Sequence, residues 1–466
     1  MNHSLPVACE EFVAYLDKIF SISLNDIKGL MVAFHSEMQK GLSGHESSLK
    51  MIPAFVDKPK GNEKGEFIAL DLGGTNFRVL TVQLDGKGSA TVQAVSKFAI
   101  SKKNMQGTGL RLFDFIADCI DSFLTENSMD RNKFYNLAFT FSFPVKQANI
   151  ADGKLIVWTK GFTATGVKGK DVIMLLNEAL KRKNINCIKV TALANDTVGT
   201  LVARSYMDPT CDMGVIMGTG TNACYREKCS KIEKLREPDS NGHMIVNMEW
   251  GNFDKCRPTW YDKELDRASV NPGAMHLEKM VSGMYLGEVT RLVLVDLIKR
   301  DLIFLHKPDA VESFKRQDSL KTAHMSLIEG DESKNLVEVE AFLNHAGISN
   351  VTLHDRIVIK RLCKIVSLRA ARLGAAAISA VITWMDLELE DKHTVGIDGS
   401  LFEKYHGFGS EMRAVFEELY GAEGEKITLV HSKDGSGKGA AIIAAVAATA
   451  GKMKRDESKK IYSKVK

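Results

Sequence analysis

Residues 67–82 constrain the fold of this chain more than any other stretch, because they predict a strand, a tight glycine turn and a second strand. Asp71 lies at the end of the first strand. The turn and the second strand supply uncovered backbone amides, a hydroxyl, a side-chain amide and a guanidinium. These donors come from Gly73, Gly74, Thr75, Asn76 and Arg78. A carboxylate beside such donors suits a metal–triphosphate.

The same design returns further along the chain at Met213–Tyr225. There Gly218, Thr219, Gly220, Thr221 and Asn222 take the place of residues 72–76. Two phosphate-sized hairpins in one chain indicate a duplicated nucleotide-binding unit with a cleft between the copies.

Composition excludes several classes of protein. The chain has 466 residues and is 44% apolar, which favours two to three compact units. Its 62 basic and 58 acidic side chains leave a net charge of +4, too balanced to indicate a nucleic-acid binder. The eight cysteines are dispersed without a Cys-x-x-Cys pair, so we expect reduced, buried or incidental thiols rather than a disulfide scaffold or a zinc site.

The sequence favours a cytoplasmic protein with no membrane partner. The N-terminal stretch has acids where a secretory signal needs an apolar run. The small-residue run Ala440–Ala450 is too short to span a bilayer. We expect the lysine-rich tail, Lys452–Lys466, to be solvated or frayed.

Strand and helix patterns alternate along the chain, which argues for an α/β protein. Helical periodicity covers residues 9–50, and residues 58–64 form a polar linker. The clearest later segments are Phe134–Phe143 (strand), Asp171–Lys183 (helix), Ile188–Ala194 (strand), Leu277–Phe304 and Leu353–Met385 (helices) and Val395–Leu401 (strand). We expect the polar stretch Lys307–Ser333 to be a surface excursion that contributes nothing to a core.

Asn195 and Asp196 follow directly after a predicted buried strand. An aspartate at such a strand end can accept the proton of an attacking hydroxyl, which is the work of a general base in phosphoryl transfer. The same residues before a helix are also typical of an N-cap.

Other polar residues leave two interpretations open. Thr159 and Lys160 could orient a polyol, or could belong to a solvated loop. Glu249 lies inside an apolar run, so it contacts a ligand or forms half of an internal ion pair. Glu278 by itself is typical of an acid on a helix surface.

The glycine-rich segment at residues 434–439 is not a Walker A loop. Ser432 stands where that motif needs glycine, and Gly439 stands where it needs Ser or Thr. What remains is a helix start whose free N–H groups favour an anion, or an ordinary cap and turn.

Together these motifs resemble the hexokinase family, over about residues 24–450. The resemblance is carried by ordered segments along nearly the whole chain. They are Phe67–Leu80, Phe139–Pro144, Trp158–Phe162, Asn195–Thr200, Gly218–Tyr225, Met248–Gly251, Glu278–Gly287, Val395–Leu401 and the segment from 434 to 441. The length is similar to that of the single-unit members of about 50 kDa.

The resemblance implies an α/β fold of two actin-like (ribonuclease H-like) lobes around a closing cleft. On this basis we place residues 1–64 and 208–440 in the large lobe. Residues 65–207 and 441–466 form the small lobe, to which the C-terminal helix returns.

The resemblance also implies an activity. It is transfer of the γ-phosphoryl group of ATP, with Mg²⁺, to the 6-hydroxyl of glucose and related hexoses, the first step of glycolysis. Fructose and mannose are further candidate substrates, ADP is the second product, and monomer and homodimer both stay open.

Residue roles implied by the resemblance fall into three groups. Asp196 would be the base, assisted by Lys160. The sugar hydroxyls would be held by Ser142, Thr159, Lys160, Asn195, Asp196, Asn222, Glu249 and Glu278. The phosphates would face Asp71, Gly73, Gly74, Thr75, Asn76, Arg78 and Thr219, with Asp398, Gly399, Ser400, Ser436, Gly437 and Lys438 flanking the nucleotide on the other lobe. Magnesium would be held mainly by phosphates and water, with Asp71 as the nearest carboxylate.

The chain departs from the family pattern beside the sugar site. Met275 stands where the family usually has a glutamine, and Leu277 replaces a common aromatic. The loop at Asn252–Lys255 also differs, and Ser400 replaces a threonine of some relatives. These changes bear on sugar preference rather than on the class of reaction.

Two other classes of function share part of this pattern. A sugar-sensing regulatory protein would keep the fold with little turnover, and the presence of Asp196 argues against it. A chaperone-like ATPase of the actin fold would share the two hairpins. It would have no use for Lys160, Glu249 and Glu278 together.

Overall fold

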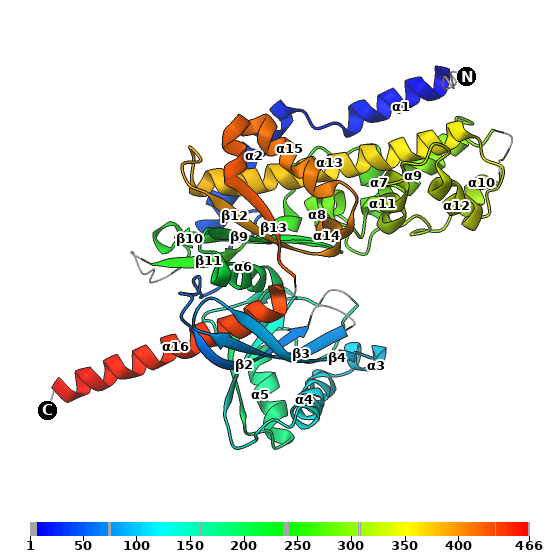
Figure 1. The fold of residues 1–466 in the computed structure, drawn as a ribbon. Helices are drawn as coiled ribbons and strands as arrows, with labels where there is room; N and C mark the ends of the chain where they lie inside the picture. The colour runs from blue at the N-terminus through cyan, green and yellow to red at the C-terminus, as the bar shows by residue number, and fades with distance from the viewer. Residues whose placement is uncertain are drawn as a thin grey trace.

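The structure is a computed structural model that describes residues 7–72, 76–158, 161–235, 242–305, 307, 309–433 and 435–464. For Asn76 and for residues 450–464 it describes the backbone. Two α/β lobes lie one above the other, with α16 passing between them (Figure 1).

The large lobe is built on a six-stranded sheet in the part of the chain that the structure describes. Its order is β1-β11-β10-β9-β12-β13. The first four strands pair antiparallel, and β12 and β13 continue parallel to β9. The strands are β1 (Ile52–Pro53), β9 (Cys211–Met217), β10 (Thr221–Lys228), β11 (His243–Asn247), β12 (His393–Asp398) and β13 (Ile427–His431).

The small lobe contains a five-stranded sheet of order β4-β3-β2-β5-β8, again counting described residues. Strands β4, β3 and β2 pair antiparallel, and β5 and β8 run parallel to β2. The strands are β2 (Lys64–Leu72), β3 (Asn76–Asp85), β4 (Ala90–Ala99), β5 (Tyr135–Phe141) and β8 (Ile188–Ala194), with a separate ribbon of β6 (Val145–Lys146) and β7 (Lys154–Leu155).

The two sheets share one topology. Each has a three-stranded antiparallel meander followed by two parallel strands, so β2-β3-β4-β5-β8 corresponds to β9-β10-β11-β12-β13. The prediction of a duplicated α/β unit is therefore confirmed. The lobe boundaries at 64 and 207 stay predictions.

Strand β2 is apolar on both faces, which explains its continuous hydrophobic run. Ile68 and Leu70 pack into a core with helices α4 (Gly109–Glu126) and α5 (Val172–Arg182). Phe67 and Ala69 point the other way, into a second core. Side chains alternate along a strand, so one sequence supplies both layers.

Helices α6 (Asp196–Met207) and α16 (Gly435–Lys464) lie between the two sheets and share that second core with residues of both lobes. They cross at a glycine pair. A Cβ on Gly439 would lie 1.9 Å from the backbone oxygen of Gly199, and one on Gly199 would lie 2.9 Å from the oxygen of Ser436. Only hydrogen side chains allow the helices to approach this closely. The packed pair α6 and α16 therefore forms the layer that joins the two lobes.

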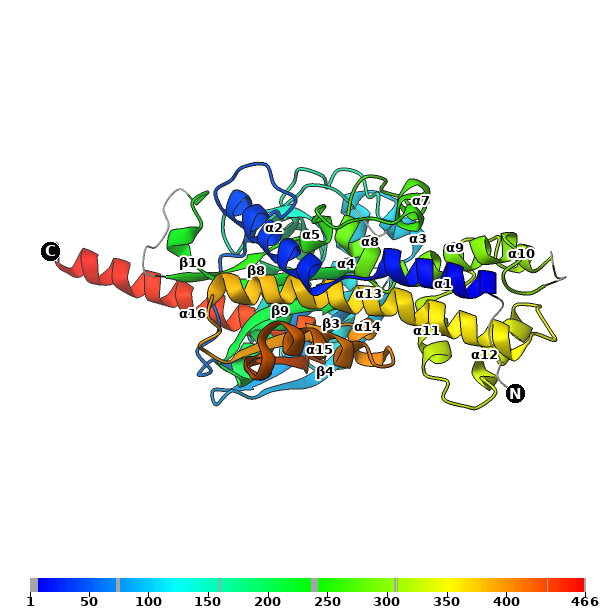
Figure 2. The same cartoon turned by 90° about the horizontal axis from the view of Figure 1, so that it is seen from above.

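Longer helices cover the outer face of the large-lobe sheet (Figures 1 and 2). The central one is α13 (Leu353–Met385), which packs against α2 (Leu24–Leu42) and α15 (Phe408–Tyr420). By length and composition α13 is the one candidate membrane span among the described residues, but 83% of its most apolar part is buried in the protein. Its hydrophobicity is accounted for by core packing.

The remaining helices are short or lie around α13. They are α1 (Val7–Phe20), α3 (Lys102–Met105), α7 (Trp260–Ala268), α8 (His276–Val281), α9 (Leu286–Lys299), α10 (Ala310–Ser313), α11 (Thr322–Glu329), α12 (Val337–His345) and α14 (Ser400–Lys404), with 3-10 turns η1 (Cys229–Lys231), η2 (Trp250–Asn252) and η3 (Gly421–Lys426). The helical pattern expected over Leu277–Phe304 corresponds to α8 and α9, which are separated by a break at residues 282–285.

One local expectation was wrong. The stretch Lys307–Ser333 was expected to add nothing to a core, yet Phe314, Met325 and Ile328 are fully buried in the main large-lobe core. The few apolar residues of this stretch are spaced so that they face α9 and α13. A mostly polar composition does not reveal that spacing. The basic tail was expected to be solvated or frayed. The backbone of α16 is helical through Lys464, and the solvation of the tail stays a prediction.

A charged cluster ties β12 to the chain that links the lobes. His393 lies 3.3 Å from Asp212 and 3.2 Å from Asp386, and Lys58 of the linker donates to Asp212 at 2.7 Å. Burial opposes the charged imidazole, but the two carboxylates outweigh it and raise the pKa of His393 above its ordinary value of 6.5. The protonated ring is therefore the form that this site stabilises.

Replacement of Gly439 by alanine should destabilise the junction of the lobes. The added methyl overlaps the Gly199 carbonyl, so both helix backbones must move, at a cost of about 2 kcal/mol or more. Urea unfolding measures this loss.

Gly29, an exposed glycine in helix α2 with open space around it, is the matched control. Gly29→Ala should leave the free energy of unfolding unchanged or raise it by up to ~1 kcal/mol. Equal effects of the two variants would contradict the account.

His393 should make stability depend on pH. Because its folded pKa is raised, its contribution is fully present below about pH 6.5 and is lost as pH rises through the folded pKa. The free energy of unfolding of the wild type minus that of His393→Asn should therefore fall between pH 6 and pH 9. Denaturant titrations across that range test this, and a difference that stays flat would show that the ring is not charged in the fold.

Candidate functional site

Carboxyl ends of parallel strands from both lobes meet at one cleft. In the small lobe, Asp71 lies near the end of β2, Ser142 follows β5 and Asn195 follows β8. In the large lobe, Gly218 follows β9 and Asp398 ends β12. Ligands of open α/β sheets bind outside these strand ends, so the topology identifies the cleft as the site.

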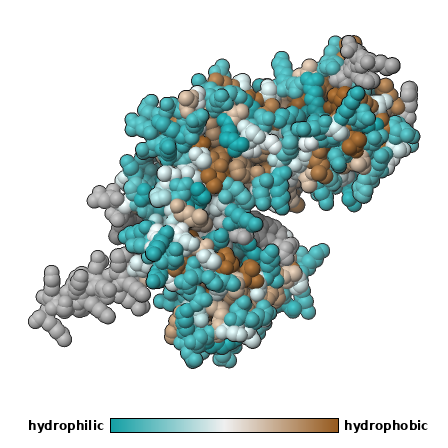
Figure 3. All heavy atoms as spheres, in the orientation of Figure 1, coloured by the Kyte–Doolittle hydropathy of each residue, from teal (hydrophilic) through white to brown (hydrophobic). Residues whose placement is uncertain are grey.

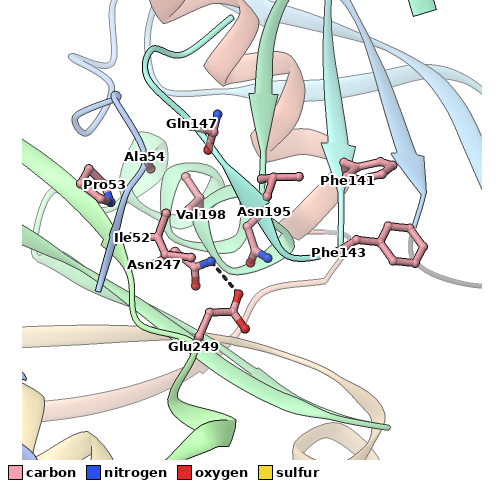
Figure 4. Close-up of a pocket in the computed structure, with 11 residues that line it drawn as sticks. Ile52, Pro53, Ala54, Phe141, Phe143, Gln147, Asn195, Val198, Asn247 and Glu249 are labelled. Carbon is pink, nitrogen blue, oxygen red and sulfur yellow. Dashed lines mark hydrogen bonds between the residues drawn. The ribbon is translucent and has the colours of Figure 1, made fainter. Parts of the chain in front are cut away.

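A cavity lies between the lobes and contains about 360 Å³ of space, including the part open to solvent. Its polar lining comes from Gln147 and Asn195 on one side and from Asn247 and Glu249 on the other. Figure 4 shows Asn247 and Glu249 on the large-lobe wall, with the Asn195 side chain on the facing wall.

Two amides hold the carboxylate of Glu249. The Nδ2 of Asn247 donates to its Oε1 at 2.8 Å, and the Nδ2 of Asn222 lies 3.4 Å from the same oxygen. The backbone of Glu249 is left-handed, with φ 55° and ψ 46°, an uncommon conformation for a residue with a side chain. Such backbone outliers concentrate at functional sites. Both interpretations of Glu249, a ligand contact and half of an internal ion pair, stay predictions.

Glu278 is partly buried and does not lie on an open helix surface. It lies in the first turn of α8, and its Oε2 accepts from the backbone N–H of Thr221 at 3.0 Å. A Cβ on Gly220 would lie 2.5 Å from that same oxygen. The glycine of the hairpin therefore makes room for the carboxylate. Met275, also left-handed with φ 57°, precedes α8 and packs its terminal methyl toward Gly251.

A buried lysine fixes the loop that carries Glu278. Lys279 donates to Asp266 at 2.6 Å and to the carbonyl of Asn271 at 2.8 Å. The N–H of Gly273 also donates to Asp266. Burial acts against ionisation, but these donors lower the pKa of Asp266. The ion pair fastens both ends of the 271–279 segment.

Asn195 and Asp196 begin helix α6. The Oδ1 of Asn195 accepts from the N–H and the hydroxyl of Thr197, so this residue is the N-cap. Asp196 is the first helical residue, and its Oδ1 also accepts from Thr197 N–H at 2.9 Å. The cap alternative is therefore correct for Asn195, and Asp196 directly follows this cavity-lining residue in the chain.

A second cluster lies under the first hairpin. Arg78 pairs with Asp71 across the β2–β3 ladder, and the hydroxyl of Ser436 donates to Asp71 at 3.1 Å. Arg78 also reaches that hydroxyl at 3.3 Å. Asp71 and Ser436 are both buried. Carboxylate, guanidinium and hydroxyl thus converge at the start of α16.

This cluster corrects one expectation. Residues 436–438 were expected on the lobe opposite Asp71, but Ser436 bonds to Asp71 and Gly437 faces Leu80 of the small lobe. The reason is that α16 begins already at Gly435, so its first turn lies against the small-lobe sheet. Lys438, in the same turn, is half-buried.

The second hairpin is held from two sides. The N–H of Gly283 donates to Gly218 O at 2.8 Å, and the N–H of Met284 donates to Thr219 O at 3.1 Å. Gly399, with φ 130°, approaches so closely that a Cβ on it would lie 2.5 Å from Met217. Asp398 and Ser400 flank this contact, and the Thr219 side chain is exposed at the hairpin tip.

Some predicted residues stay untested by the structure. Gly73, Gly74, Thr75, Thr159 and Lys160 lie outside the described residues, as does the side chain of Asn76. Ser142 is buried, and its N–H donates to Leu72 O across the sheet. Their proposed roles remain predictions.

Asn247 is a site residue that sequence reasoning missed. It is 7% exposed, lines the cavity and contacts both Asn222 and Glu249. A usable signal existed, because an asparagine interrupts the apolar strand pattern two residues before Glu249, at strand spacing.

Comparison with known proteins places this geometry in a family. Family models described as hexokinase match residues 13–206 and 212–446. The chain belongs to the hexokinase family. The recognition of the family from sequence motifs is thereby confirmed.

Individual hexokinases support the same assignment. The chain is 37% identical to a solved hexokinase from Schistosoma mansoni in complex with glucose, with a TM-score of 0.85 over 94% of this chain and 99% of that one. A second solved hexokinase gives 30% identity and a TM-score of 0.83, covering 95% of this chain and all of the other. These matches confirm the two-lobed fold.

Curated relatives are longer. Hexokinase-3 of Rattus norvegicus is 40% identical over 438 residues, which cover 92% of this chain and 46% of that protein. Hexokinase-2 of Homo sapiens is 42% identical over 428 residues, covering 88% and 45%. The chain thus spans about half the length of the curated relatives it matches.

Proposed function

We propose that this hexokinase-family chain transfers the γ-phosphoryl group of ATP to the 6-hydroxyl of glucose and related hexoses, with Asp196 as general base. The observation that carries the proposal is the cavity where Asn195 faces Asn247 and Glu249 across the cleft. The glucose complex of the Schistosoma mansoni relative supports a hexose as the ligand. The first step of glycolysis, in the cytoplasm, is the corresponding role.

The chemistry asked of Asp196 is one proton transfer. Its carboxylate accepts the proton of the sugar 6-hydroxyl as that oxygen forms a bond to the γ-phosphorus and the bond to the β–γ bridging oxygen of ATP breaks. The products are hexose 6-phosphate and ADP. Anchoring through Thr197 N–H fixes the carboxylate at the start of α6, where it can stay aligned with an incoming hydroxyl.

Carboxylates and amides suit a sugar, because each hydroxyl is both donor and acceptor. Glu249 and Glu278 would accept hydroxyl protons, and Asn222 would donate to hydroxyl oxygens. A site of this kind discriminates against a ligand that lacks a hydroxyl, since a buried polar group is then left unpaired. Met275 cannot supply the amide of the usual glutamine. We therefore expect one hydrogen bond to the sugar to be missing beside Glu278, and discrimination between hexoses to be weaker there.

The nucleotide phosphates would lie between the two hairpins. Arg78 and the start of α16 offer positive charge and N–H donors beside Asp71. No cluster of three or more His, Cys, Asp or Glu side chains suited to a metal occurs among the described residues. Asp71 and the Ser436 hydroxyl are oxygen donors that fit Mg²⁺ arriving with the nucleotide. When bound, the ion neutralises phosphate charge.

Water competes with the sugar for the phosphoryl group, so the cleft must exclude it. In Figure 3 the upper and lower lobes are separated by a gap on the right-hand side of the molecule. Closure of the lobes on the sugar would remove water and complete the site only when substrate is bound.

MgATP-dependent ADP release measured with glucose, fructose and mannose, each omitted in turn, tests the proposal. We expect sugar-dependent turnover, with the ranking of sugars reporting the effect of Met275. ADP release that is indifferent to every sugar would overturn it, and binding of sugar without turnover would favour the regulatory alternative.

Asp196→Ala should lower kcat by about 10²–10⁴-fold, the range for a positioned acid–base group, and leave glucose affinity nearly unchanged. Steady-state kinetics and calorimetry of glucose binding separate the two effects. Asp171→Ala is the matched control, because Asp171 caps the start of α5 through Ile173 N–H, away from the cavity. It should cost ~1 kcal/mol of stability and keep kcat. Near-wild-type kcat in Asp196→Ala would refute the assignment of the base.

Gly220→Ala should weaken glucose binding about tenfold with little change in melting temperature. The new methyl displaces the Glu278 carboxylate, which is the far end of a flexible side chain, so the fold adjusts while the sugar contact is lost. Calorimetry and thermal unfolding measure the two quantities. A variant that kept wild-type affinity would exclude Glu278 from the sugar site.

A further inference from the structure

Asn247 lies where the wall of the cavity changes from apolar to polar. It ends strand β11, pairs with Cys224 of β10 across the ladder and is 7% exposed. Met244, Ile245, Val246 and Met248 surround it in the sequence. A buried amide in such a run costs free energy unless both of its ends are hydrogen-bonded.

Both ends of this amide are used, and by residues of the site. Its Nδ2 donates to Glu249 Oε1 at 2.8 Å, and its Oδ1 accepts from Asn222 Nδ2 at 2.9 Å. Asn222 is oriented in turn, because its Oδ1 accepts from the N–H groups of Ala223 and Trp250. The direction of every bond in this chain is fixed, so a flip of either amide would place like groups together.

The arrangement matters because Glu249 begins the η2 turn with a left-handed backbone. The carboxylate projects from a short irregular segment rather than from a regular helix or strand. Sites on such segments need neighbouring hydrogen bonds to hold their geometry. Asn247 stands on a strand of the sheet and can supply that rigidity.

We propose that Asn247 is a positioning residue for hexose binding, which sets the separation and orientation of Glu249 and Asn222 before the sugar arrives. The inference rests on the proposed function and assigns a role to a residue outside the predicted site. Prior orientation reduces the ordering cost of binding, so its loss should appear in sugar affinity. ATP binds at the hairpins, away from this amide, and should be affected little.

Three variants and glucose calorimetry without nucleotide test the proposal. Asn247→Ala should raise the Kd for glucose about tenfold or more, the usual effect of losing a buried hydrogen bond to a charged group, while the KM for ATP changes less than twofold. Asn247→Asp keeps the shape but places a second acid beside Glu249, so it should weaken glucose binding at least as much. Asn136→Asp, a partly buried asparagine at the far end of β5, is the control and should bind glucose normally.

A double-mutant cycle distinguishes positioning from general loss of structure. If Asn247 acts through Glu249, then Asn247→Ala should cost much less in a Glu249→Gln background than in the wild type. Purely additive effects, or parallel rises in the glucose Kd and the ATP KM, would overturn the proposal. So would a glucose Kd within twofold of wild type in either Asn247 variant.

Failure of the proposed function would look different. In that case the wild-type chain itself would bind no hexose, and the inference would fall with it. If the wild type binds glucose and the Asn247 variants bind equally well, only the inference fails. Should Asn247→Ala unfold, the isosteric Asn247→Asp decides the question alone.

Discussion

The close approach of two glycines is the constraint on which the arrangement of the lobes depends. Gly199 on α6 and Gly439 on α16 bring two helix backbones into contact between the sheets. Because side chains at this crossing are hydrogen atoms, the start of each helix reaches the cleft: α6 begins with Asp196 and α16 begins at Gly435, beside Ser436. The proposed base and the proposed anion-binding start of α16 are therefore both positioned by one packing contact.

Polar residues on either side of that contact form two separate networks. One joins Asn222, Asn247 and Glu249 at the cavity wall, and the other joins Asp71, Arg78 and Ser436 below the first hairpin. The proposed reaction would use this division, since it moves a phosphoryl group from a charged nucleotide to a neutral polyol. Amides and carboxylates recognise hydroxyls, while N–H groups and a guanidinium recognise phosphate.

Much of this could be predicted from residues 67–82 and 213–225 alone. Two strand–glycine–strand hairpins predicted a duplicated unit, and both sheets do share one topology. Long motifs identified the family because their order and spacing are specific. Prediction failed where the hydrophobic pattern is weak. Phe314 and Met325 lie in a polar stretch that was predicted to contribute nothing to a core. Their burial depends on the helices that pack over them.

The sequence by itself determined the fold class, the family and the identity of the chemical groups, because hydrophobic period and glycine placement act locally along the chain. Only the tertiary structure decided which groups meet. Ser436 and Asp71 are far apart in the chain and become bonded through the path of α16. Asn247 looked like an ordinary strand residue until β10 and β11 paired. Contacts of this kind depend on the packing of distant segments, which no local pattern encodes.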